Sequence, residues 1–186
     1  TDFKQLEKED SPNTGSMGSI SYSNHRAPFL TESDIVLARE INCKTVEFLN
    51  KDNKELYKGI IYGSYIKCYS GEIKIIEFNS RYGDPECINA LELLETSLYD
   101  IYKGIIYNRL VFVTPIYSNV NMVSKYLVPY FYPEKNESIY EIEPNWYKAN
   151  KSNIILSSVN KYENLILSTS SRTLVYFEKG DDLNLI

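Results

Sequence analysis

A short stretch of this chain carries oxygen and guanidinium groups at a spacing suited to metal and phosphate chemistry. It runs from Lys74 to Glu86 and reads KIIEFNSRYGDPE. Glu77 and Asn79 are two residues apart, so on a strand their side chains project from the same face. Both supply hard oxygen ligands of the kind Mg²⁺ prefers, and that ion commonly takes only one or two ligands from protein. Arg81 follows with a planar fork suited to phosphate.

Two interpretations of this stretch remain open from the residues alone. It is either a nucleotide and metal site or an edge strand that runs into a charged turn. A second stretch, Ser11–Ser19, reads SPNTGSMGS and is rich in small residues. Backbone N–H groups in such a loop can surround an anion. Loops of this kind are common, so the second stretch indicates little by itself.

Taken together and in this order, the two stretches resemble the phosphoribosylamine–glycine ligase family, whose members are ATP-grasp enzymes of purine biosynthesis. The usual loop of that family reads GPNTGGMG, and its metal strand ends in EFNxRFGDPE. This chain has SPNTGSMG and EFNSRYGDPE at the corresponding places. The resemblance runs through nearly all 186 residues and is to the C-terminal half of archaeal-type members.

The resemblance implies a reaction and a set of site residues. Family members use ATP as co-substrate, with Mg²⁺ or Mn²⁺, to join glycine to 5-phosphoribosylamine through a glycyl phosphate. By resemblance, Glu77 and Asn79 are the metal ligands, and Arg81 and Asp84 are the catalytic residues. The substrate-binding residues implied in the same way are Asp2, Lys4, Asn13, Thr14, Gly15 and Arg172. Simpler roles stay open for some of these: helix capping for Asp84, and plain surface positions for Lys4 and Arg172.

The chain departs from the family pattern at three positions. Gln5 replaces an arginine, and Ser16 stands where the family has glycine, so a backbone that needs positive φ there would be strained. Ser64 occupies a candidate third metal position on the preceding strand, but a hydroxyl is a weak ligand. These departures keep an alternative open, in which a decayed ATP-grasp homologue acts as a binding or scaffold protein. A biotin-carboxylase-like enzyme shares Glu-x-Asn-x-Arg but is not expected to have the loop.

The helices and strands that the sequence predicts around these residues indicate an α+β fold. We expect the C-terminal part of an ATP-grasp domain over residues 1–110, an antiparallel sheet with helices, followed by a small, mostly β C-terminal domain over 111–186. A capping box at Thr31–Asp34 predicts a helix that ends near 51–54 and buries its apolar stripe. Residues 59–68 and 73–79 predict an antiparallel hairpin, and one helix with a buried face is expected from Pro85 through Ile101. Four short strands are predicted at 121–128, 154–159, 165–169 and 173–177.

Composition excludes several classes of protein. A chain that is 43% hydrophobic and 13% aromatic can form a packed core, and a net charge of −5 gives no support to nucleic-acid binding. Cys43, Cys68 and Cys87 lack C-x-x-C spacing, which favours reduced thiols in a cytoplasmic protein. The single histidine, His25, argues against a catalytic triad. No apolar run is long enough to span a membrane.

The chain begins at Thr1 and not at Met, so we expect a piece of a longer polypeptide. The family keeps an N-terminal domain, an ATP lid and the adenine-contacting strand ahead of this region. We therefore expect the isolated fragment to have little ligase activity without that N-terminal half. The expected partners are ATP, glycine and phosphoribosylamine, with no nucleic acid and no membrane, and we expect a monomer.

Overall fold

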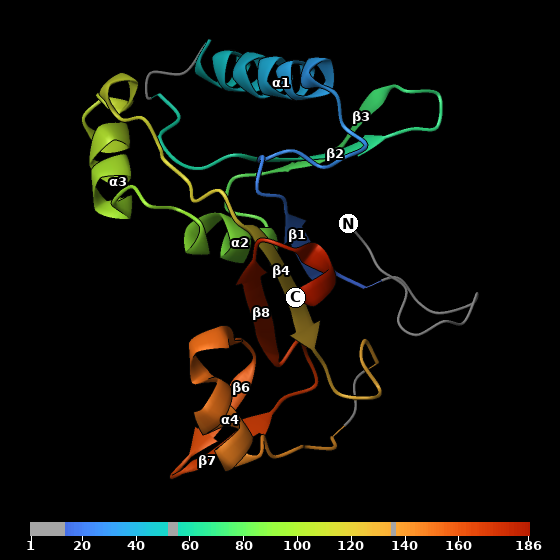
Figure 1. Ribbon diagram of the computed structural model, residues 1–186. Coiled ribbons are helices and arrows are strands. Elements are labelled where there is room, and N and C mark those ends of the chain that lie inside the picture. Colours follow the sequence, from blue (N-terminus) through green and yellow to red (C-terminus); the bar gives the residue numbers. More distant parts are fainter. Residues whose placement is uncertain (1–13, 52–55, 135–136) are drawn as a thin grey trace. The chain divides into compact units, whose positions relative to one another are not determined.

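The computed structural model describes residues 14–51, 56–134 and 137–186 (Figure 1). They form two compact units. The first contains the residues up to Ser21, with Asp84–Asn89 and Val120–Ile186; the second contains Tyr22–Gly83 and Ala90–Asn119. Helices and antiparallel sheets occur together, which confirms the predicted α+β class. The predicted boundary between residues 110 and 111 stays a prediction.

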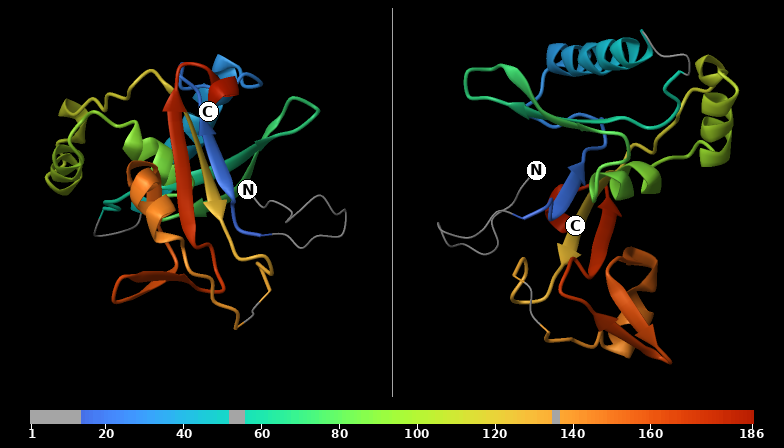
Figure 2. Two further views of the ribbon diagram at one scale, coloured as in Figure 1. Left: turned by 60° about the horizontal axis from the view of Figure 1, so that its bottom comes forward. Right: turned by 180° about the vertical axis from the view of Figure 1, so that it is seen from behind.

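The first unit is built on a four-stranded antiparallel sheet with the order β1-β4-β8-β5. Figure 2 shows β1, β4 and β8 side by side. β1 lies partly within the stretch expected to be a loop, and its Gly18 approaches β4 closely. A Cβ on Gly18 would lie 2.8 Å from the Ser124 carbonyl oxygen, so only glycine allows this pairing without a shift. The strands are β1 (Gly18–Ser21), β4 (Asn121–Leu127), β5 (Ile154–Leu156) and β8 (Leu174–Gly180).

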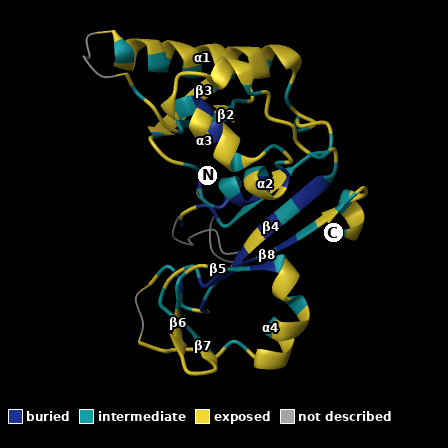
Figure 3. Cartoon of the chain, turned by 90° about the vertical axis from the view of Figure 1, so that its left-hand side faces the viewer, coloured by how far each residue is buried: buried dark blue, intermediate teal, exposed yellow. Residues whose placement is uncertain are grey.

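The core of the first unit lies on β4 and β8, where Figure 3 shows buried stretches interrupted by less buried ones. Met122 and Val175 are fully buried, and Leu174 and Phe177 nearly so. Asn89 belongs to this core as well. Its Nδ2 donates to the carbonyl oxygens of Ser19 and Met122, so the start of helix α2 (Glu86–Glu92) is tied to both β1 and β4.

The remaining described elements of the first unit are a small hairpin, a short helix and two 3₁₀ helices. The hairpin consists of β6 (Val159–Tyr162) and β7 (Leu165–Ser168). One strand was predicted over 154–159, but the structure divides it into β5 and β6, because the N–H groups of Ser157 and Ser158 donate to the carbonyls of Thr173 and Arg172. Helix α4 (Pro144–Asn150) was not predicted, although a carboxylate cap followed by proline in the first turn is a helix-start signal. The two 3₁₀ helices are η2 (Lys151–Asn153) and η3 (Leu183–Leu185).

The second unit contains helix α1 (Glu32–Asn50) and the hairpin of β2 (Tyr62–Lys67) and β3 (Ile73–Asn79). The predicted helix and the predicted antiparallel hairpin are both confirmed, and the capping box forms between Thr31 and Asp34. The expected burial of the apolar stripe on α1 is wrong: no residue of α1 is buried, and Phe48 is 77% exposed. The two-stranded sheet that contacts α1 is too small to cover that stripe.

The single helix predicted from Pro85 is also wrong. The structure forms two helices, α2 and α3 (Leu98–Ile106), with 3₁₀ helix η1 (Leu110–Phe112) after them. Between the helices, Leu93 O accepts from Ser118 N, and Glu95 N donates to Ile116 O. The backbone there pairs with a distant segment, which ends α2 despite the helical spacing of the apolar residues. Among the described helices, none combines the length and apolar character needed to cross a bilayer.

Candidate functional site

The predicted metal ligands lie together at the end of β3. Glu77 and Asn79 project from one face of the strand, and Asn79 Nδ2 donates to Glu77 Oε1 at 2.8 Å. Donation by the amide nitrogen leaves Asn79 Oδ1 as an acceptor. Within the described part of the chain, neither this oxygen nor Glu77 Oε2 has a hydrogen-bond partner. The strand therefore presents two available oxygens of the type that divalent cations bind.

An irregularity in the hairpin accompanies this pair. Ser64 pairs with Glu77, whereas Tyr65 pairs with Ile75, so Ile76 is an extra residue on β3. A bulge of this kind bends its strand and changes the direction of nearby side chains. Ser64 is buried directly opposite Glu77, at the position that sequence reasoning selected on the preceding strand.

The donor set fits a cation that takes most of its ligands from elsewhere. Among residues 14–51, 56–134 and 137–186, no three His, Cys, Asp or Glu side chains gather into a metal-binding group. Glu77 and Asn79 instead form a two-oxygen set. Mg²⁺ is usually held in this way, by one or two protein oxygens together with substrate phosphates and water.

Arg81 follows this pair in the chain, but within the described residues its guanidinium makes no hydrogen bond to Glu77 or Asn79. Its side chain is exposed, and Nη1 donates to the carbonyl oxygen of the neighbouring Tyr82 at 2.9 Å. The guanidinium has further N–H donors beyond this one. A role for Arg81 on phosphate stays a prediction.

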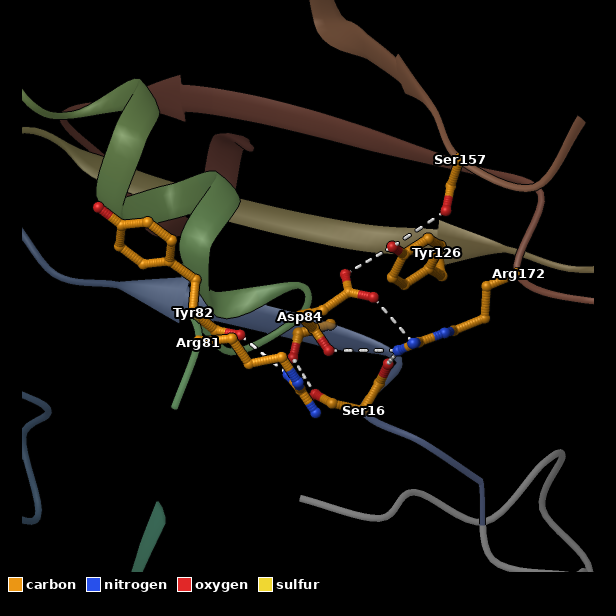
Figure 4. A network of polar contacts seen from close by, with 8 residues as sticks. Ser16, Arg81, Tyr82, Asp84, Tyr126, Ser157 and Arg172 are labelled. Carbon is orange, nitrogen blue, oxygen red and sulfur yellow. Dashed lines mark hydrogen bonds and ion pairs between the residues drawn. The ribbon is translucent and has the colours of Figure 1, made fainter. Parts of the chain in front are cut away.

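A second cluster of predicted site residues lies in the first unit (Figure 4). Arg172 Nη2 and Asp84 Oδ2 form an ion pair at 2.8 Å. Arg172 Nη1 donates to the carbonyl oxygens of Ser16, at 2.8 Å, and Asp84, at 3.2 Å. The Arg172 side chain is 23% exposed and that of Asp84 is 41% exposed. Residues that are 88 positions apart in the chain are thus joined by a partly buried, charge-assisted contact.

The loop before β1 rests on the same guanidinium. A Cβ on Gly15 would lie 3.5 Å from Arg172 Nη1, so the guanidinium is in contact range of this backbone. Thr14 and Ser16 are buried on either side of Gly15. The described non-glycine residues with positive φ are His25, Asn108 and Glu163. Ser16 is not one of them, so the strain expected at this serine does not arise.

Sequence reasoning missed one member of this cluster, Tyr126. Its hydroxyl donates to Asp84 Oδ1 at 2.6 Å and lies 3.4 Å from Ser157 Oγ, while its ring lies 4.7 Å from Cζ of Arg172. Burial, with the Asp84 hydrogen bond as a further cause, raises the pKa of Tyr126 to about 12. The hydroxyl therefore remains a donor at neutral pH. The only sequence signal was an inward position on a strand, which does not distinguish one of 17 tyrosines.

The structure thus brings Gly15, Asp84 and Arg172 together in one unit, and Glu77 and Asn79 together in the other. Thr14 is buried next to Gly15 in the chain. The predicted substrate-binding residues Asp2, Lys4 and Asn13 lie outside the described residues, as does Gln5.

Comparison with known proteins first identifies the class of protein to which the fold belongs. Residues 1–87 match the family described as phosphoribosylglycinamide synthetase, ATP-grasp (A) domain. The structure is also similar to the crystal structure of a phosphoribosylamine–glycine ligase from Thermotoga maritima. The TM-score is 0.63 at 21% sequence identity, and the match covers 99% of this chain and 44% of the other. The fold is that of ATP-grasp enzymes.

Sequence relatives then give the family. The chain is 38% identical over 179 residues to the phosphoribosylamine–glycine ligase of Methanothermobacter thermautotrophicus, a match that covers 95% of this chain and 40% of the relative. It is 41% identical over 174 residues to that of Pyrococcus furiosus, with 92% and 38% covered. The resemblance to the phosphoribosylamine–glycine ligase family is confirmed along nearly the whole chain. The chain spans about 40% of the length of these relatives.

Proposed function

We propose that the protein to which this chain belongs joins glycine to 5-phosphoribosylamine and converts ATP to ADP and phosphate. The observation that carries the proposal is the pairing of Glu77 with Asn79 at the end of β3, with one oxygen of each side chain still available. Such a pair suits a divalent cation that is bound together with a nucleoside triphosphate. The relatives named for this reaction support the choice of substrates.

The chemistry needs little covalent participation by the protein. The glycine carboxylate attacks the γ-phosphate of ATP, which releases ADP and forms glycyl phosphate. The amine of phosphoribosylamine then attacks the acyl carbon, and phosphate leaves. Positioning and charge stabilisation supply most of the catalysis in such transfers.

The residues of the second unit act on the nucleotide side in this proposal. Glu77 and Asn79 hold Mg²⁺ or Mn²⁺, which when bound neutralises phosphate charge and orients the triphosphate. Arg81 directs its remaining N–H donors to the transferred phosphoryl group. The exposure of all three side chains, which is partial for Asn79, is compatible with contact to a ligand.

The residues of the first unit act on the acceptor side. Arg172 binds the ribose phosphate through the N–H groups that Asp84 and Ser16 do not use, while Thr14, Gly15 and Asp84 line the acceptor site. Asp2, Lys4 and Asn13 join them by resemblance to the family. By the same resemblance, Asp84 is the catalytic carboxylate on this side.

Further parts of the proposal concern the whole protein. We assign residues 1–110 to the C-terminal part of the ATP-grasp domain and 111–186 to a small, mostly β C-terminal domain. An N-terminal half supplies the ATP lid and adenine contacts, and the enzyme is a monomer. The three free cysteines and the metabolic substrates favour the cytoplasm.

The test is formation of glycinamide ribonucleotide by the protein as its gene encodes it, with ATP, glycine or Mg²⁺ omitted in turn. The expected result is product that requires all three, with turnover lost in Glu77→Ala and retained in Glu72→Ala, an exposed carboxylate on the same hairpin. A folded wild-type protein that binds these ligands without turnover would contradict the proposal and favour a decayed homologue.

A further inference from the structure

Tyr126 contacts both members of the Asp84–Arg172 ion pair. Its hydroxyl donates to the carboxylate, and the face of its ring lies against the guanidinium (Figure 4). The residue is only 5% exposed. One buried side chain therefore fixes the direction of both charged groups.

Three acceptor atoms hold the Arg172 guanidinium in addition to the Tyr126 ring. The Asp84 carboxylate takes one Nη2 hydrogen, and the carbonyls of Ser16 and Asp84 take those of Nη1. A guanidinium has five N–H hydrogens, so Nε and the second Nη2 hydrogen have no acceptor within the described part of the chain. These two hydrogens form one edge of the fork, and an anionic group can accept both at once.

The ring and the hydroxyl have separable effects. Contact with a ring face restrains the plane of a guanidinium, because the cation is attracted to the centre of the ring. The hydroxyl restrains Asp84 Oδ1, so that Oδ2 remains aimed at Arg172. The raised pKa of Tyr126 keeps this hydroxyl protonated, so its donor role persists across neutral and mildly alkaline pH.

We infer that Tyr126 is a positioning residue that aims the remaining donor edge of Arg172 at the phosphate of the acceptor substrate. The inference rests on the proposed function for the identity of that anion. Tyr126 does not contact substrate. It acts through Asp84 and Arg172, and its effect should appear in acceptor binding rather than in the use of ATP.

The test compares Tyr126→Phe with wild type and with Tyr132→Phe, in the protein as its gene encodes it. Phenylalanine keeps the ring against Arg172 and removes only the hydroxyl. Tyr132 is a matched control because it is a buried tyrosine of the same unit, 9% exposed. The expected result is a rise of about five- to tenfold in KM for phosphoribosylamine in Tyr126→Phe, with KM for ATP within twofold of wild type. Tyr132→Phe should leave both KM values and kcat unchanged.

A second variant separates the ring from the hydroxyl. Tyr126→Leu removes both contacts, so its acceptor KM should rise further than that of Tyr126→Phe. An unchanged acceptor KM in Tyr126→Phe, or a fall in kcat with KM constant, would overturn the inference.

Hydrogen exchange of residues 14–21 supplies a readout that does not need activity. Arg172 holds this loop through the Ser16 carbonyl, so a loosened guanidinium should speed exchange there in Tyr126→Phe and not in Tyr132→Phe. If wild type makes no product, the proposed function fails, and exchange alone decides the positioning role. Equal exchange in all three proteins would then overturn it.

Discussion

The two candidate clusters differ in how far contacts within the protein neutralise their charges and satisfy their hydrogen-bonding groups. In the first unit, Arg172 and Asp84 neutralise one another, and Tyr126 packs against both. In the second unit, Glu77 has an amide as its neighbour, and its negative charge has no cationic partner within the described residues. The first arrangement is formed before any ligand arrives, whereas the second leaves a charge for a ligand to neutralise.

This difference predicts opposite consequences of mutation. A group that is already paired contributes to stability, so its loss should affect both folding and binding. An exposed group with available oxygens contributes little to stability, so its loss should affect activity alone. The variants below are chosen to separate these two patterns.

The largest effect is expected for Glu77→Gln. The amide keeps the shape and can still contact Asn79, but it lacks the charge that holds a divalent cation. We expect kcat to fall by about 10²–10³-fold, as for the loss of a single group that stabilises transition-state charge. The thermal midpoint should not change, because Glu77 is exposed. Glu72→Gln is the control, and a kcat within threefold of wild type in Glu77→Gln would contradict the metal role.

Arg172→Lys should have the next largest effect. Lysine keeps the charge but loses the planar fork, so it cannot hold Asp84 and Ser16 together while presenting two further donors. We expect KM for the acceptor to rise about tenfold or more, and the free energy of unfolding to fall by about 1–2 kcal/mol. Steady-state kinetics and urea denaturation measure the two quantities. Arg109→Lys, at an exposed arginine, should change neither, and a normal acceptor KM in Arg172→Lys would refute its phosphate contact.

Asn79→Ala should have a smaller effect that concerns the metal alone. One neutral oxygen is lost, while the Glu77 carboxylate remains. We expect the Mg²⁺ concentration for half-maximal activity to rise about three- to tenfold, with kcat at saturating Mg²⁺ nearly restored. Titration of activity with Mg²⁺ measures this directly. A reduced kcat that added Mg²⁺ does not restore would indicate a different role for Asn79.

The smallest effect concerns the contact between α1 and the turn end of the hairpin, and it depends on pH. A hydrogen bond from Lys67, followed by those from Thr31, lowers the pKa of Asp34 to about 2 from 3.8. Because the folded-state pKa is depressed, this stabilisation is present above about pH 4 and is lost as pH falls toward 2. Asp34→Asn should therefore be less stable than wild type at pH 6, and the gap in stability should narrow steadily as pH falls from 4 toward 2. Urea midpoints at pH 6 and pH 2.5 test this, and a gap at pH 2.5 as large as that at pH 6 would argue against the assignment.

The local features of the fold were readable from the sequence. Two-residue spacing on an apolar strand placed Glu77 and Asn79 on one face, and a Thr-x-x-Asp pattern marked the start of α1. Both depend on residues a few positions apart, where strand and helix geometry decides the outcome. Among the site residues, Asp84, Gly15 and Arg172 were named by resemblance, but their mutual contact was not predicted.

Contacts between residues far apart in the chain determine the remaining features of the fold and of the site. Such contacts leave little signal in the local sequence. The Asp84–Arg172 pair spans 88 residues, and Tyr126 joins it from a third segment. Pairing of Glu95 with Ile116 divided one predicted helix into two. The apolar stripe of α1 has helical spacing, but its burial depends on what packs against it, which spacing does not encode.

The most direct measurement is a paired titration of one protein preparation with Mg²⁺ and with phosphoribosylamine, for wild type, Asn79→Ala and Arg172→Lys. If the two clusters serve different ligands, Asn79→Ala should shift only the Mg²⁺ dependence and Arg172→Lys only the acceptor dependence. A shift of both dependences in both variants, or of neither, would contradict this division between the hairpin pair and the Arg172 cluster.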